Sequence, residues 1–158
     1  MAERVIVKQD KNFRTAFLTA DPEDIHLENF EPVESIHQLT PYGMLLSSLA
    51  SCTAQVLHTY AQNHDIALEE VELQMFYQRV YREDCDSCDE EQRFSEEIQE
   101  KILLVGDISA AQRDKLLRVA SFCPVHKIIT TNIRVVTSLI EAELNDEFNT
   151  SARDEPDF

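Results

Sequence analysis

The chain has 158 residues, 43% of them hydrophobic, which suffices for one domain with a core. Its net charge of −16, from 30 acidic and 14 basic side chains, would repel phosphate backbones, so we expect no nucleic-acid partner. No apolar run is long enough to cross a membrane, and the first residues lack the apolar block of a signal peptide, so we expect a cytoplasmic protein that does not bind membranes.

The N-terminal elements form a predicted β-hairpin. Residues 4–9 and 13–19 alternate like strands and flank the short polar turn "DKN". Residues 21–39 are irregular and contain Pro22 and Pro32, so they predict a loop that wraps the surface, with a short strand at residues 24–28.

A long helix is predicted from Thr40 to about Asn63. Thr40 can cap it, and Pro41 suits its first turn. Apolar side chains recur at steps of three and four residues and place Cys52 in the middle of an apolar face. Cys52 is therefore either a core residue or a reactive thiol, and the spacing alone favours the core.

Two further strands, at residues 68–81 and 94–107, alternate apolar and polar side chains and predict a long hairpin. Ser109 and Gln112 match a capping box at the start of the next helix. Residues 133–142 predict a last strand. The single domain then covers residues 1–143, and residues 144–158 form an acidic, flexible tail.

Cys123 begins the segment "CPVHK" and also has two interpretations. If Pro124 is the first residue of a short helix, Cys123 lies at its N-cap, where backbone N–H groups stabilise a thiolate. Alternatively, Cys123 closes the apolar side of the preceding helix. His126 follows within a turn, and we expect it to orient groups by hydrogen bonding.

The tip of the long hairpin contains a C-x-x-C motif, Cys85 and Cys88, among acidic residues. This spacing is typical of an exposed loop, half of a zinc site or a redox pair, and these alternatives stay open. No cofactor is expected. The remaining histidines carry no functional prediction.

Two segments resemble the OsmC/Ohr family of thiol-dependent peroxidases. They are "TPYGMLLSSLASCTAQ" and "GDISAAQRDKLLRVASFCPVHKII", and the likeness covers roughly residues 38–131. The resemblance implies an α+β fold in which antiparallel sheets wrap around central helices in an intertwined homodimer.

The resemblance also implies a mechanism. Cys52 falls on the peroxidatic position and Cys123 on the resolving one, so that an organic hydroperoxide is reduced through a Cys52 sulfenic acid and a Cys52–Cys123 disulfide. An external dithiol, from a lipoyl protein or a thioredoxin-like protein, would then reduce the disulfide. Tyr42, Leu49 and His126 are the expected substrate-binding residues.

The sequence departs from the family pattern around the thiolate. Family peroxidases pair the thiolate with an arginine that is held by a glutamate at the start of the cysteine helix, where this chain has Tyr42 and Gly43. Arg14, in the N-terminal hairpin, is the candidate for the arginine, and Glu31 or Glu34 could replace the glutamate. Two alternatives therefore compete with a peroxidase: a non-enzymatic relative that binds a small apolar ligand, and a metal or redox sensor built on the C-x-x-C motif.

Overall fold

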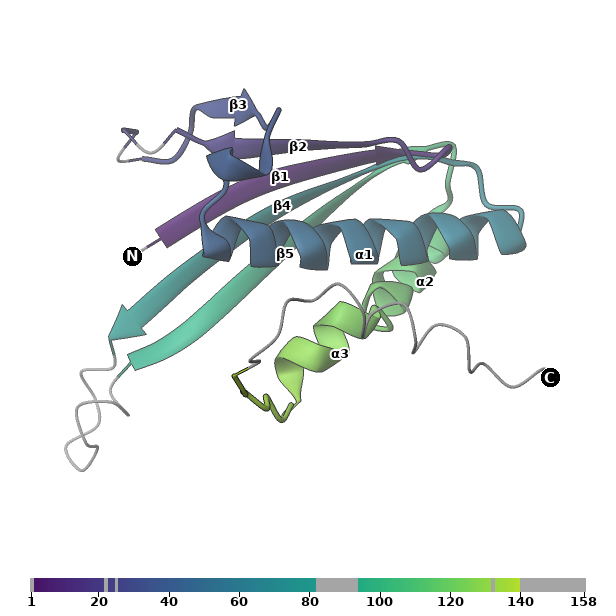
Figure 1. Ribbon diagram of the computed structural model, residues 1–158. Coiled ribbons are helices and arrows are strands. Elements are labelled where there is room, and N and C mark those ends of the chain that lie inside the picture. The colour runs from purple at the N-terminus through teal and green to yellow at the C-terminus, as the bar shows by residue number, and fades with distance from the viewer. Residues whose placement is uncertain (1, 22, 25, 82–93, 132, 140–158) are drawn as a thin grey trace, which may run out of the picture.

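The structure is a computed structural model that describes residues 2–21, 23–24, 26–81, 94–131 and 133–139. Within these residues, one antiparallel sheet is covered on one face by helices, so the fold class is α+β (Figure 1). The C-x-x-C motif and the predicted C-terminal tail lie outside the described residues.

The sheet has five strands in the order β3-β2-β1-β4-β5. Both predicted hairpins are confirmed: the first pairs Val5 with Thr19, and the second pairs Met75 with Glu100. The first hairpin joins the second through β1 and β4, which are also antiparallel. The strands are β1 (Ala2–Asp10), β2 (Thr15–Ala20), β3 (Phe30–Pro32), β4 (Leu68–Tyr81) and β5 (Phe94–Gly106).

The helices begin where their caps predict. Thr40 accepts a hydrogen bond from the N–H of Gly43 at the start of α1 (Pro41–Asn63). Ser109 and Gln112 form both bonds of the predicted capping box at the start of α2 (Ala110–Ala120). A 3₁₀ helix, η1 (Ile36–Gln38), precedes α1, and a short helix, α3 (Pro124–Thr130), follows α2.

The core lies between the sheet and α1. Helix α1 packs across β1 and β4, and α2 and α3 pack against α1 (Figure 1). Every second residue of β1 and β4 points at the helix, which explains the alternation of the sequence. None of the described helices is long and apolar enough to cross a membrane. The buried strand residues include Val5, Val7, Val71, Leu73 and Met75.

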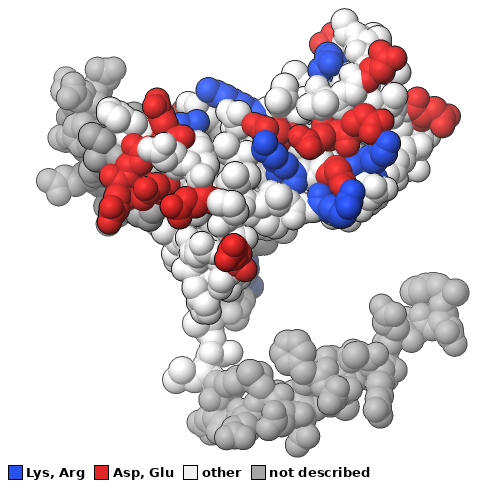
Figure 2. Space-filling model, turned by 90° about the horizontal axis from the view of Figure 1, so that it is seen from above, with Lys and Arg blue, Asp and Glu red and all other residues white. Residues whose placement is uncertain are grey.

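The other face of the sheet is mostly polar, although Leu103 and Val105 of β5 are exposed on it. Figure 2 shows acidic and basic side chains next to one another on this side of the molecule. Lys8 and Glu72, on neighbouring strands, lie 3.3 Å apart there. This face is therefore solvated, and the chemistry must be sought on the helical side.

Two predicted strands are wrong. The short strand forms at Phe30–Pro32, where it pairs with β2, and not at residues 24–28. Residues 133–139 of the predicted last strand form no strand in the described chain, and four of their apolar side chains are between 59% and 97% exposed. A strand needs a partner for its backbone N–H and C=O groups, and the apolar pattern of this segment cannot supply one.

Candidate active site

The structure brings the side chains of Cys52 and Cys123 together, although they lie on elements far apart in the sequence. Cys52 is in the middle of α1, and Cys123 is the N-cap of α3. Both are free thiols, and they are close enough for a hydrogen bond between them to raise the Cys52 pKa. Two thiols so placed can exchange between reduced and disulfide forms.

Cys123 is held in both of the ways that its sequence context suggests. It is fully buried, between α1 and the end of α2. Its thiol donates to the carbonyl of Leu49, with Sγ and oxygen 4.0 Å apart, and its Sγ accepts from the N–H of His126 at 3.5 Å. The predicted N-cap is therefore confirmed, and it fixes the sulfur in one position.

Cys52 is partly buried, and its surroundings hold it as a neutral thiol. Burial raises the Cys52 pKa above its ordinary value, and Cys123 raises it further. The backbone N–H of Val125 acts in the opposite direction, whereas the charge of Glu100 adds to the increase. The side chains that shift this pKa are thus acids, and the net shift is upward.

A cavity of about 500 Å³ lies between the first half of α1, the β4–β5 hairpin and α3. Neither cysteine lines it, but Leu49 and His126 do, and their backbone groups contact the Cys123 sulfur. Its walls are largely apolar and aromatic, and Tyr42 stacks on Tyr77 with the ring centroids 4.7 Å apart. All three residues expected to bind substrate line this cavity: Tyr42, Leu49 and His126.

Cys52 itself lines a second hollow, a groove of about 600 Å³ between α1 and α2. One basic side chain, Lys115 of α2, lines this groove as well. Lys115 is not among the site residues predicted from the sequence, although Leu116 and Ala120 mark the apolar face of α2 beside it.

Glu100 of β5 is the acidic residue of the site that the sequence analysis missed. It lines the cavity, and burial raises its pKa, while the Thr53 hydroxyl and His126 lower it. The Thr53 hydroxyl is near Glu100, yet the geometry falls short of a hydrogen bond, so Thr53 Oγ1 and Glu100 Oε1 are both buried without a partner. The signal was available: Glu100 falls on the same side of its strand as Ile98 and Ile102.

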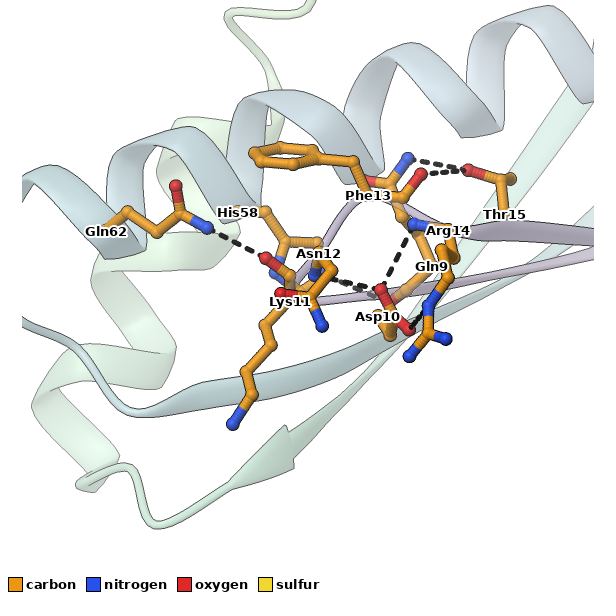
Figure 3. Close-up of polar contacts among 9 residues, drawn as sticks. All are labelled: Gln9, Asp10, Lys11, Asn12, Phe13, Arg14, Thr15, His58 and Gln62. Atoms are coloured by element: carbon orange, nitrogen blue, oxygen red, sulfur yellow. Dashed lines mark hydrogen bonds and ion pairs between the residues drawn. The ribbon is translucent and has the colours of Figure 1, made fainter.

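Arg14, the expected cation, lies in the turn between β1 and β2 (Figure 3). Its side chain is 80% exposed, and its Nε pairs with Asp10 Oδ2 at 2.7 Å. The same hairpin contacts α1 at His58, whose Nε2 donates to the carbonyl of Gln9, and at Gln62, which donates to the carbonyl of Lys11. Arg14 is not among the groups that shift the Cys52 pKa.

The place of the missing glutamate is occupied from another element. A Cβ on Gly43 would come within 2.9 Å of Glu3 Oε1, so it is the carboxylate of β1 that lies against the start of α1. Glu31 and Glu34, the replacements considered from sequence, are both exposed on or after β3. Among the described residues, no group of three or more histidine, cysteine and acidic side chains is arranged to hold a metal ion.

Comparison with known proteins gives one family. The model of the OsmC-like protein family matches residues 34–138, more than half of the chain. No curated protein matches it.

Two solved structures resemble the chain. One is an OsmC-like hydroperoxide resistance protein from Jannaschia sp., with a TM-score of 0.57 and 11% identity over 92% of this chain and 95% of that one. The other is the organic hydroperoxide resistance protein OhrB of Bacillus subtilis, with a TM-score of 0.46 and 14% identity over 82% of this chain and 91% of that one. At such identities, the first likeness establishes the fold alone.

Proposed function

The chain belongs to the OsmC-like family, and from this premise we propose that it is a cysteine-based peroxidase that reduces organic hydroperoxides to alcohols. The observation that carries the proposal is the contact between the Cys52 and Cys123 side chains beside a largely apolar cavity. An apolar cavity suits the organic group of a hydroperoxide better than it suits hydrogen peroxide. Both solved relatives are named for hydroperoxide resistance.

In the proposed reaction, the Cys52 thiolate attacks the distal oxygen of the hydroperoxide. An S–O bond forms, the O–O bond breaks, and the organic part leaves as an alcohol once it gains a proton. The sulfur, now a sulfenic acid, is attacked by Cys123, which forms the disulfide and releases water. A dithiol, from a lipoyl protein or a thioredoxin-like protein, then restores both thiols.

We also propose that the active form is a homodimer. On the helical side of the described chain, large apolar side chains lie open to solvent, including Leu117 at 63% exposure and Phe122 at 74%. Such surfaces typically become buried against a partner. The exposed segment of residues 133–139 would gain strand partners in the same way.

Mass spectrometry after one equivalent of cumene hydroperoxide tests the proposed reaction. The protein should lose two hydrogen atoms, and peptide mapping should place the new disulfide between Cys52 and Cys123. Cys123→Ser should stop at the sulfenic acid, which dimedone traps, and Cys52→Ser should not react at either position.

The same experiment separates the alternatives. Unchanged mass in the wild-type protein would contradict a peroxidase and favour the apolar-ligand-binding alternative, which the raised Cys52 pKa supports. A disulfide that maps to Cys85 and Cys88 alone would favour the redox-sensor alternative.

A further inference from the structure

Glu100 occupies a position in β5 where the neighbouring residues on the same face are aliphatic. Ile98, Ile102 and Leu104 lie on the same face of β5, where they pack against the core under α1. Glu100 comes between them in this row, directly opposite the buried Met75 of β4. A carboxyl group there is costly unless it has a use, because its neighbours offer little solvation.

The carboxyl group of Glu100 is poorly satisfied in the resting protein. Its Oε1 is buried and makes no hydrogen bond of good geometry, and the nearby Thr53 Oγ1 is also buried and makes none. Almost all buried polar atoms in native proteins have a partner, so a poorly satisfied carboxyl group at a cavity wall calls for an explanation.

Glu100 also lies near the cysteine pair. The Thr53 hydroxyl close to its carboxyl group belongs to the residue that follows Cys52 on α1, and His126 lines the same cavity. The charge of Glu100 adds to the increase in the Cys52 pKa. A thiolate and a carboxylate in one poorly solvated space disfavour each other, so such a pair holds one proton between them. The titratable groups around Glu100 are Cys52 and Tyr42 from α1, Tyr77 from β4, Cys123 and His126 from α3, and Glu96 on its own strand.

We propose that Glu100 is the acid–base residue of the peroxidase reaction: it accepts the proton of the Cys52 thiol and delivers it to the departing alkoxide. This inference rests on the proposed function and adds a catalytic group to it. The Cys52 thiolate forms the S–O bond as the O–O bond breaks, the sulfur is oxidised and the peroxide reduced, and protonated Glu100 neutralises the alkoxide. The step converts a thiol and a hydroperoxide into a sulfenic acid and an alcohol, and Glu100 ends as it began, a carboxylate.

This role supplies the acid that the leaving group needs. An alkoxide is a poor leaving group, so the acid is required at the moment when the O–O bond breaks, and a positioned acid typically contributes about 10²- to 10⁴-fold. Because Glu100 and Cys52 share one proton, the hydroperoxide rate should stay level between their two pKa values. It should fall below the raised pKa of Glu100, where both groups are protonated.

Glu100→Gln tests the proposal, because it should move two rates in opposite directions. The reaction with cumene hydroperoxide should slow about tenfold to a hundredfold at pH 7. Alkylation of Cys52 by iodoacetamide should speed up about two- to fivefold, because iodide leaves without a proton and the carboxylate no longer raises the thiol pKa. A role confined to structure would move both rates together or neither.

The pH profile and two further variants complete the test. Glu100→Gln should turn the level profile into one that rises about tenfold per pH unit, since a single thiol then titrates. Glu100→Asp should restore part of the hydroperoxide rate. Glu97→Gln, which removes the same charge from an exposed residue of the same strand, should leave both rates and the profile unchanged.

The outcomes separate the inference from the function on which it rests. A wild-type protein that does not react at Cys52 overturns both. A wild-type protein that reacts, together with a Glu100→Gln variant of equal thermal stability that keeps the hydroperoxide rate, leaves the peroxidase standing and overturns the role of Glu100.

Discussion

At the scale of single residues, the two cysteines of the site could be predicted from the sequence, whereas Glu100 was missed. Cys52 and Cys123 could be found because cysteines on a predicted helix face and at a predicted N-cap are distinctive. Glu100 could have been found from the strand alternation, but an acidic residue in an acid-rich chain is usually taken as solvated. Arg14 could not be placed, because its pairing with Asp10 depends on the shape of the turn and not on the strand pattern.

Thr53 offers a residue-scale prediction. Its hydroxyl is fully buried and lowers the pKa of Glu100, so it stabilises that carboxylate. Thr53→Val, which keeps the shape, should therefore lower the free energy of unfolding by about 1 kcal/mol in a urea titration. The exposed Thr59 on the same helix provides the control, because Thr59→Val removes no buried polar atom.

The same variant should change the chemistry in a defined direction. The Thr53 hydroxyl lowers the pKa of Glu100, so its loss should raise that pKa and shift the acid limb of the hydroperoxide reaction to higher pH. A variant whose stability falls as if a hydrogen bond had been lost, with an unmoved acid limb, would show that Thr53 is bonded elsewhere.

At the scale of elements, the predictions are right for helix ends, which depend on nearby residues, and wrong for strands, which depend on a partner strand. Thr40 and Ser109 cap their helices as predicted, because capping depends only on residues within one turn. The short strand after β2 forms at Phe30–Pro32, where β2 has free backbone groups, and this could not be read from residues 24–28. Residues 133–139 have the right composition for a strand but meet no sheet edge in the described chain.

The α2 cap can be tested directly. Ser109→Ala removes the acceptor for the Gln112 N–H, so it should lower the free energy of unfolding by about 1 kcal/mol. Ser48→Ala, an exposed serine inside α1, should cost nothing, because alanine is the better helix former. Equal effects of the two substitutions in urea titrations would contradict a capping role.

At the scale of the whole molecule, the two sides differ in the apolar surface that they expose to solvent. The outer face carries charges of both signs, as Figure 2 shows, whereas the helical side leaves Leu117, Phe122 and the apolar residues after α3 open to solvent. The buried face of α2 follows from its apolar spacing, but the amount of apolar surface left open depends on how α2 and α3 pack against α1. The proposed homodimer would cover the open side.

Sedimentation should therefore give twice the 18.2 kDa mass of one chain at micromolar concentration. Val136→Asp places a charge on a side chain that is 72% exposed in the single chain, so it should weaken the dimer at least tenfold if the segment is buried there. Glu97→Gln, on the outer face of the sheet, serves as a charge-changing control. A wild-type monomer at these concentrations would rule the dimer out.

The unequal exposure of the two sulfurs would set the direction of the proposed recycling. Cys123 has no exposed surface, whereas Cys52 lines the groove between α1 and α2. An incoming dithiol would therefore meet the Cys52 sulfur of the proposed disulfide, and Cys123 would depart as the thiolate. The N–H of His126, already directed at the Cys123 sulfur, would stabilise that leaving group and so make the proposed exchange regioselective. The reductant would form a mixed disulfide with Cys52, which its own second thiol would then resolve. The buried Cys123 would form no mixed disulfide with the reductant.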